Sequence, residues 1–386
     1  MPIDAAHVAR PPRLRLGMVG GGRDAFIGAV HRIAARLDDQ YDLVAGCFSS
    51  TAAKSAGSGA DLGLDPARVY ADYAAMAEAE AGRIDAVSIV TPNHLHAPVA
   101  RAFLARGIHV LCDKPLTATL DEARALEAEA ARSDALFILT HNYTGYPMVR
   151  QARAMVAAGD LGPIRVVQVE YAQDWLSTPL ERTGQKQAEW RTDPARSGGG
   201  GATGDIGTHA YNLACFVTGL RAESLAADLH RFVPGRRLDD NGHVLMRMTG
   251  GARGMLWCSQ VAPGNENALR LRVYGETGGL EWSQEDPNYL WFTPLGQPKR
   301  LITRNGAGAG PEAGRVSRIP PGHPEGYLEG FATLYAEAAR AIHARKAGRP
   351  LPEGVVFPTL ADGVAGVAFV DACVRSSARD AAWTAL

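Results

Sequence analysis

The sequence predicts an α/β domain with a doubly wound parallel sheet, followed by an α+β domain with a large, mostly antiparallel open sheet. Two patterns indicate this fold class. Up to about residue 140, short apolar runs typical of buried parallel strands alternate with segments of helical spacing. After about residue 145, strand-like segments follow one another with turn signals between them. Because 386 residues exceed what one core usually holds, we expect two domains, 1–142 and 143–386.

The first domain contains five near-continuous apolar runs, which we expect to be strands: 15–19, 43–48, 86–90, 108–112 and 136–140. Apolar residues at helical spacing, together with capping signals, predict helices over 27–37, 72–81, 97–106 and 119–133. Gly107 follows the third of these helices, where a C-cap glycine is common. This alternation indicates a parallel sheet that is covered by helices on both faces.

The second domain is expected to begin with a helix over 148–158 and an alternating strand over 164–171. A glycine-rich patch at 197–201 then leads into a helix over 205–217. Further strands are expected over 223–232, 243–249, 252–260, 268–275 and 288–293, with a hairpin turn at 275–279. Two helices, 326–345 and 359–376, close the chain, and 305–322 is expected to be a mobile loop.

The composition excludes several classes of function. With 40 Lys and Arg against 41 Asp and Glu, the net charge of −1 gives no field that would hold nucleic acid or an anionic membrane. The five cysteines lie far apart without a CxxC or Cys/His cluster, so we expect no disulfide framework and no metal site. No apolar run approaches the roughly 20 residues that span a bilayer, and the polar N-terminus shows no secretory signal. We therefore expect a cytoplasmic protein.

A glycine turn follows the first expected strand, at Gly20, Gly21 and Gly22, with Gly28 six residues further on. Glycines at a first strand-to-helix turn let the backbone approach a pyrophosphate and aim N–H groups at it. The usual fingerprint has its third glycine three residues earlier, so the turn would be three residues longer here. A plain tight turn is the alternative, but the position favours dinucleotide binding.

The end of the second expected strand lacks the carboxylate that usually binds the adenosine ribose. Ser49, Ser50 and Thr51 stand there, and Lys54 follows. Hydroxyls with a nearby lysine could accept the 2′-phosphate of NADP, or they could simply cap the next helix. The choice between NAD and NADP stays open at this point.

Lys114 lies directly after the strand 108–112, in Cys112-Asp113-Lys114-Pro115. Ligands of open α/β sheets bind outside the carboxyl ends of the strands, and the proline favours an extended Lys114 at that edge. Beside the positive ring of an oxidised nicotinamide, a lysine would take part in proton transfer more readily. The alternative is a surface lysine paired with Asp113. The scarcity of lysine in this chain favours the catalytic role.

Asp205 and His209 are four residues apart on the expected helix 205–217, so their side chains share one face. An imidazole that titrates near neutral pH is a suitable base for a hydroxyl proton, and the carboxylate could orient it or bind a sugar hydroxyl. Alternatively, Asp205 merely complements the helix dipole and His209 is incidental.

Taken together, these motifs resemble the Gfo/Idh/MocA family of nicotinamide-dependent oxidoreductases, in the branch that acts on sugars, polyols and glycosides. The resemblance covers nearly the whole chain. It is carried by GMVGGG and IGAVH within 17–31, VSIVTPNHLH at 87–96, DKP at 113–115, HNYTGYP at 141–147, QDW at 173–175, WR at 190–191 and GDIGTH at 204–209. It implies a Rossmann fold for the first domain.

The resemblance also implies a role for each matching position. Lys114 would hydrogen-bond the reacting hydroxyl, His209 would act as general acid/base and Asp205 would orient the substrate. Contacts to NAD or NADP are implied for Gly20, Gly21, Gly22, Phe26, Ile27, Ser49, Ser50, Lys54, Thr91, Pro92, Asn93, His96, Asp113, Lys114, Asn142, Trp190 and Arg191. The sugar pocket would include Tyr143, Gln173, Trp175 and Arg191, although a large aromatic residue is more often part of a core.

We therefore expect an NAD(P)-dependent dehydrogenase that oxidises a secondary hydroxyl of a cyclic polyol, sugar or glycoside. Three alternatives stay open: a redox-neutral enzyme that retains its coenzyme and cleaves a glycoside, a non-catalytic sensor, and reduction of a ketone. A sheet face with Met246, Met248, Trp257 and Tyr274 is expected to bury against a second subunit, in a homodimer or homotetramer.

Overall fold

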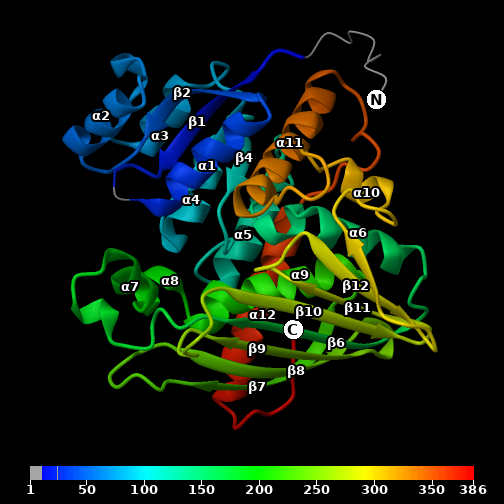
Figure 1. Ribbon diagram of the computed structural model, residues 1–386. Coiled ribbons are helices and arrows are strands. Elements are labelled where there is room, and N and C mark those ends of the chain that lie inside the picture. Colours follow the sequence, from blue (N-terminus) through cyan, green and yellow to red (C-terminus); the bar gives the residue numbers. More distant parts are fainter. Residues whose placement is uncertain (1–10, 24) are drawn as a thin grey trace, which may run out of the picture.

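The computed structural model describes residues 11–23 and 25–386, which form two sheets with helices packed on them (Figure 1). The N-terminal stretch 1–10, where no secretory signal is expected, lies outside the described residues, as does Asp24. Within the described residues, the first sheet has the order β2-β1-β3-β4-β5 and is parallel throughout. The second has the order β13-β12-β11-β10-β6-β9-β8-β7-β14 and is antiparallel except between β6 and β9. The predicted fold class is confirmed.

The first sheet consists of β1 (Leu14–Gly20), β2 (Tyr41–Cys47), β3 (Ala86–Val90), β4 (His109–Cys112) and β5 (Phe137–Leu139). The helices between these strands are α1 (Phe26–Leu37), α2 (Ala52–Asp61), α3 (Tyr73–Ala79), α4 (His96–Leu104) and α5 (Leu120–Ala130). The range of α2 was not predicted, because its small residues, including Gly57 and Gly59, give no apolar periodicity.

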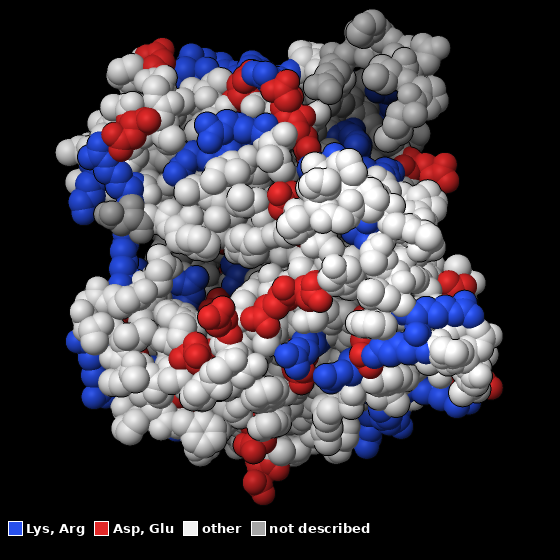
Figure 2. Space-filling model, viewed as in Figure 1, with Lys and Arg blue, Asp and Glu red and all other residues white. Residues whose placement is uncertain are grey.

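The carboxyl ends of three strands meet at one edge of this sheet. Gly20 of β1 pairs with Val90 of β3, and Ile89 of β3 pairs with Cys112 of β4. The glycine turn, Thr91 and the Asp113-Lys114 pair therefore leave the sheet side by side. Figure 2 shows a hollow between the two halves of the molecule.

The second sheet consists of β6 (Ile164–Ala172), β7 (Ala222–His230), β8 (Asn241–Met248), β9 (Arg253–Ser259), β10 (Ala268–Gly275), β11 (Gly278–Ser283), β12 (Tyr289–Pro294), β13 (Arg300–Thr303) and β14 (Thr384–Ala385). The helices α6 (Pro147–Ala157), α9 (Thr208–Thr218) and α12 (Leu360–Ser377) share its apolar core. Two short helices, α7 (Lys186–Arg191) and α8 (Pro194–Ser197), extend to one side of it (Figure 1).

Met246 and Met248 lie in this core, at 1% and 0% exposure, so the prediction that they face outward is wrong. Side chains alternate between the two faces of a strand, and on β8 it is Leu245 that points away from the helices. Trp257 is partly exposed and Tyr274 is 37% exposed, as expected for the outer face. The apolar residues of the outer face are thus Leu245, Met255 and Val166 beside Trp257 and Tyr274, and charged residues such as Glu170 and Arg272 lie on the same face.

Helix α11 (Tyr327–Lys346) returns to the first sheet from far along the chain. It packs on α1, and its Phe331 and Tyr335 join the core formed by β1 and α1 (Figure 1). His31 of α1 shares a hydrogen bond with the Tyr335 hydroxyl at 2.9 Å, in full burial. This helix thus contacts both the core of the first sheet and the turn Asn142–Gly145 that precedes α6.

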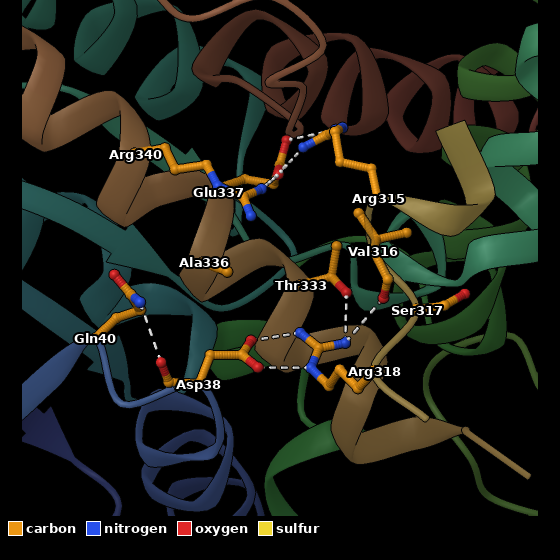
Figure 3. A pocket seen from close by; sticks show the side chains of 10 residues that line it. All are labelled: Asp38, Gln40, Arg315, Val316, Ser317, Arg318, Thr333, Ala336, Glu337 and Arg340. Atoms are coloured by element: carbon orange, nitrogen blue, oxygen red, sulfur yellow. Dashed lines mark hydrogen bonds and ion pairs between the residues drawn. The ribbon is translucent and has the colours of Figure 1, made fainter. Parts of the chain in front are cut away.

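The segment 305–322, expected to be mobile, is anchored by ion pairs around a cavity of about 160 Å³ (Figure 3). It includes the short helix α10 (Pro311–Gly314), in which Ala313 is fully buried. Arg318 donates to both carboxylate oxygens of Asp38, at 2.8 and 2.5 Å. Arg315 donates to both oxygens of Glu337 on α11, at 2.6 and 3.1 Å. These partners are too distant in sequence for a local pattern to indicate them.

Glu337→Gln is expected to lower the free energy of unfolding by about 3–5 kcal/mol. Glu337 is fully buried and pairs with Arg150, Arg315 and Arg340. Burial alone would raise its pKa, but the hydrogen bond from Arg315 and the charge of Arg150 outweigh burial and hold that pKa below the usual range. The substitution would leave the buried Arg150 guanidinium without a countercharge. Denaturant midpoints measure the effect. Glu276→Gln, in an exposed pair with Arg165, should change little; an equal loss in both variants would contradict this assignment.

Candidate active site

The glycine turn after β1 leaves its backbone open at the N-terminus of α1. Gly20 and Gly21 have φ of +85° and +68°, which favours glycine. A Cβ on Gly20 would lie 2.6 Å from the Val90 carbonyl oxygen, and one on Gly22 would lie 2.8 Å from that of Phe48. Gly28 packs so closely on Gly21 that its Cβ would lie 2.3 Å from the Gly21 Cα. A turn this close and free of side chains fits a pyrophosphate.

Two buried polar atoms near this edge have no partner in the described part of the protein. They are Oγ1 of Thr91, directly after β3, and Nδ2 of Asn142, which follows β5 and lines the large cavity described below. Buried polar groups are nearly always hydrogen-bonded, so both atoms are available to a ligand. Phe26 and Ile27, in the first turn of α1, also line this cavity. The residues present therefore fit a bound dinucleotide.

The residues after β2 keep the coenzyme question open. The Ser49 hydroxyl accepts a hydrogen bond from the Thr51 N–H at 3.1 Å within the turn before α2, and Thr51, the N-cap residue of α2, makes no side-chain capping bond. Ser50 and Lys54 are exposed around the start of α2, where a 2′-phosphate could reach them. The geometry after β2 is therefore compatible with NAD and with NADP.

His96 and Asn93 have structural tasks that the sequence did not reveal. The buried His96 ring places Nδ1 2.7 Å from the Pro115 carbonyl oxygen and Nε2 2.8 Å from that of Thr91. Both ring nitrogens thus face backbone carbonyl oxygens, so His96 joins the ends of β3 and β4, and its contact with a coenzyme stays a prediction. Asn93, next to Pro92, donates to the Ser197 carbonyl oxygen at 2.9 Å and so connects the two halves of the chain.

Lys114 and Asp205 meet at the centre of the site. The Lys114 Nζ donates to Asp205 Oδ1 at 2.7 Å and to the Asp205 carbonyl oxygen at 2.9 Å. Asp113 does not hold the lysine side chain, because its Oδ1 accepts the Lys114 backbone N–H and the Thr140 hydroxyl. The reading of Lys114 as a surface lysine paired with Asp113 is therefore wrong.

Asp205 lies in a π-helical turn, Thr203–Gly207, just before α9, and such turns are frequent at functional sites. Its Oδ2 lies 3.3 Å from Arg191 Nε and accepts a 2.9 Å hydrogen bond from Gln260. Burial alone would raise the pKa of Asp205, but the positive charges of Lys114 and Arg191 outweigh it and hold that pKa well below the usual range. Asp205 is therefore a carboxylate that fixes the lysine. No motif indicated Gln260, which follows β9.

His209 lies one turn further along α9 and lines the same cavity as Asp205. Its ring is buried, with ring centres 4.9 Å from Tyr143 and 5.2 Å from His141. Burial, followed by the charge of Lys114, holds the pKa of His209 well below its usual value. The imidazole is consequently neutral at pH 7 and able to accept a proton.

The cavity that these residues share has a volume of about 1060 Å³. One side is formed by residues from the first domain and the other by residues from the second. Polar amides are prominent in the lining, together with Trp175: Asn142, Gln173, Gln185, Gln187, Asn267, Gln284 and Asn288. Trp175 thus lies in the pocket and not in a core. Trp190 instead stacks beneath Arg191, whose guanidinium lies 4.3 Å from its ring centre.

Asn267 connects several of these amide side chains by hydrogen bonds, and it was not predicted from the sequence. Its side-chain oxygen accepts hydrogen bonds from Tyr171 at 2.7 Å and Gln173 at 2.8 Å. Its nitrogen donates to Gln284 at 2.9 Å, and Trp175 donates to Gln173 at 3.1 Å. Asn267 precedes β10 in a loop without a motif, so no sequence signal could have found it.

Within the described residues, no helix is both long and apolar enough to cross a bilayer. The described residues also contain no group of three or more His, Cys, Asp or Glu placed to hold a metal ion. The five cysteines are buried free thiols.

Comparisons with known proteins show the same class of protein as this geometry. Residues 14–141 match the model of the oxidoreductase family with an NAD-binding Rossmann fold, and residues 149–281 match the GFO/IDH/MocA C-terminal domain. The chain is an oxidoreductase with an NAD-binding Rossmann domain. It belongs to the Gfo/Idh/MocA family, which confirms the resemblance found in the sequence.

Three relatives illustrate the similarity. The crystal structure of an oxidoreductase from Sinorhizobium meliloti is 62% identical, with a TM-score of 0.89, and the match covers 97% of this chain and 99% of that chain. An inositol dehydrogenase homolog from Azotobacter vinelandii, complexed with NADH and myo-inositol, is 39% identical, with a TM-score of 0.90 and coverage of 97% and 98%. Levoglucosan dehydrogenase of Pseudarthrobacter phenanthrenivorans is 26% identical over 95% of this chain and 97% of its own length.

Proposed function

We propose that this protein oxidises a secondary hydroxyl of a cyclic polyol, sugar or glycoside. One observation carries the proposal: Lys114, Asp205 and His209 line a single cavity that also reaches the first turn of α1. Lys114 comes from the first domain and the other two come from the second, so only the folded chain assembles them. The relatives named for inositol and levoglucosan support a substrate that carries several hydroxyls.

A bound nicotinamide would supply the hydride acceptor. His209, neutral at pH 7, takes the proton of the substrate hydroxyl. Lys114 donates a hydrogen bond to the same oxygen and stabilises the negative charge that develops there. Asp205 holds Lys114 by two contacts, with its carboxylate and its backbone carbonyl, which keeps Nζ in one position.

For the coenzyme we propose NAD, because the homolog from Azotobacter vinelandii was solved with NADH. Ser50 and Lys54 leave room for NADP, and separate assays with the two coenzymes decide between them. A higher kcat/KM with NADP would overturn the choice of NAD.

Purified protein should accumulate reduced coenzyme when it is mixed with NAD or NADP and a panel of inositols, monosaccharides, anhydrosugars and disaccharides. Absorbance of the reduced nicotinamide measures the reaction. Cleavage of a disaccharide or glycoside without net reduction would instead establish the redox-neutral alternative. Ketone reduction is tested by running the assay from the reduced coenzyme.

A neutral sugar or polyol should be oxidised with a kcat/KM at least about tenfold higher than its phosphate ester. Among the described residues that line the cavity, the cations are Lys114 and Arg191, and both pair with Asp205. Glu266 and Glu285 add negative charge to the same lining. Kinetics with matched pairs of substrates measure the ratio, and Glu285→Gln should narrow it. A phosphate ester that equals the neutral compound would contradict this prediction.

We propose that the apolar outer face of the second sheet joins two or four copies of the chain. Leu245 and Met255 are 53% and 45% exposed there, beside the partly exposed Trp257. Large exposed apolar patches on soluble proteins usually mark an interface. Light scattering after gel filtration tests the assembly, and a monomer would refute it.

We also propose that the protein is located in the reducing cytoplasm, because its five cysteines are free thiols.

A further inference from the structure

His141 lies directly against the candidate base and has no place in the function described so far. It follows β5 and is 1% exposed. Its Nδ1 lies 3.4 Å from the Nδ1 of His209, and the two rings meet edge to face at an interplanar angle of 83°. The main chain holds it in place: its carbonyl oxygen accepts hydrogen bonds from the Thr144 N–H at 3.1 Å and the Thr144 hydroxyl at 2.8 Å.

A contact between two Nδ1 atoms has room for only one hydrogen, so one ring donates and the other accepts. A neutral imidazole carries its hydrogen on one nitrogen and its lone pair on the other. With Nδ1 of His209 turned toward His141, Nε2 is the nitrogen left for the substrate. If His209 is to take a proton at Nε2, its own hydrogen must lie on Nδ1.

We propose that His141 is the positioning residue that accepts a hydrogen bond from the Nδ1–H of His209 and thereby directs the Nε2 lone pair of His209 to the substrate hydroxyl. The base role of His209 comes from the proposed function, and the assignment of the tautomer comes from the contact itself. In the reaction, the hydroxyl proton moves to Nε2 of His209 while the hydride leaves with the coenzyme. His141 gains and loses no proton, and its hydrogen bond becomes charge-assisted when His209 is positive.

The surroundings of the two rings keep His141 in the role of acceptor. Burial, followed by the charge of Lys114, lowers the pKa of His141 to about 3, although Asp362 and Asp113 act in the opposite direction. A neutral His141 places no second positive charge beside the imidazolium that forms on His209. The charged groups that face His209 itself are Lys114 and Asp205.

His141→Phe should remove the acceptor while it preserves most of the ring volume. We expect kcat to fall by about 10- to 100-fold, the usual effect of losing the partner that orients a functional histidine, with KM and coenzyme affinity nearly unchanged. His141→Asn keeps an acceptor oxygen close to the former Nδ1 and should recover most of the activity. Thr144→Val is the matched control, because it removes a hydrogen bond to the same residue but leaves the imidazole pair intact.

A second measurement reports the tautomer without any turnover. In protein labelled with ¹⁵N-histidine, NMR should show His209 with its hydrogen on Nδ1, identified by the signals that His209→Ala removes. His141→Phe should convert this to a mixture of tautomers. His209 protonated on Nε2 in the native protein, or His141→Phe with native kcat, would overturn the inference. A protein without dehydrogenase activity but with the Nδ1–H tautomer would refute the proposed function and leave the hydrogen bond from His209 to His141 and the tautomer assignment standing.

Discussion

Lys114→Ala is expected to reduce kcat by about 100- to 10 000-fold while coenzyme affinity stays close to that of the native protein. The Nζ of Lys114 is held by the Asp205 carboxylate and carbonyl within the cavity, so it is in place to donate to a substrate oxygen. Alanine removes this donor and also leaves the Asp205 carboxylate with the positive charge of Arg191 and the hydrogen bond from Gln260. Steady-state kinetics, with coenzyme titration by fluorescence, measure the two effects separately.

Lys299→Ala provides a matched control, because Lys299 pairs with Glu281 on the surface of the second sheet. It should keep full turnover. Lys114→Arg should also be strongly impaired, since a planar guanidinium does not place a donor where the compact ammonium does. Native turnover in Lys114→Ala would remove the lysine from the reaction and favour a sensor that only binds coenzyme and sugar.

His209→Ala is expected to cut kcat by about 100- to 10 000-fold and to change the response of activity to pH. In the native protein, burial and Lys114 hold the pKa of His209 below 6.5, so the neutral base is present at pH 7 and somewhat below it. As the pH falls through that lowered pKa, the ring becomes protonated and can no longer accept the hydroxyl proton. Oxidation should therefore decline only at pH values below 6.5, and the variant should lose this acid limb.

The check is a pH profile of kcat/KM between about pH 5 and 9 for both proteins. His243→Ala is the control, because His243 lies exposed on the second sheet beside Trp257. It should leave the profile unchanged. An acid limb that persists in His209→Ala would assign the base to another group.

The redox-neutral alternative uses the same residues, so these variants do not separate it from net oxidation. Both reactions would begin with removal of a hydroxyl proton and transfer of hydride. They differ in whether reduced coenzyme leaves the protein. Accumulation of free reduced coenzyme over many turnovers therefore decides between them, and the cavity geometry is compatible with either.

Local patterns revealed the parts of this protein whose physical cause is local. The glycines at 20–22 indicate a phosphate-binding turn at the end of a strand. Pro115 favours an extended Lys114 at the end of another strand. The same holds for Asp205 and His209 on one helical face, since a spacing of four residues places two side chains together in any helix. Parallel strands then bring their carboxyl ends to one edge. These rules were enough to predict the two folding units and to favour a catalytic role for Lys114, whereas the roles of Asp205 and His209 came from the resemblance to the family.

The tertiary structure decided everything that depends on residues meeting across the chain. Sequence could not reveal that Gln260 donates a hydrogen bond to Asp205, that Gln173 donates one to Asn267 or that α11 packs on α1. Each of these contacts joins segments that are far apart in the sequence. Sequence also could not show that His96 lies between two backbone carbonyl oxygens, because such a histidine looks the same in sequence as one beside a ligand. Side chains of a strand alternate between its two faces with a period of two residues. An error of one position in the predicted alternation of β8 therefore assigned Met246 to the outer face, although it lies in the core. Candidate catalytic residues can be identified from the sequence. Their hydrogen-bond partners, their tautomers and the direction in which their side chains point are fixed only when segments distant in the sequence pack together.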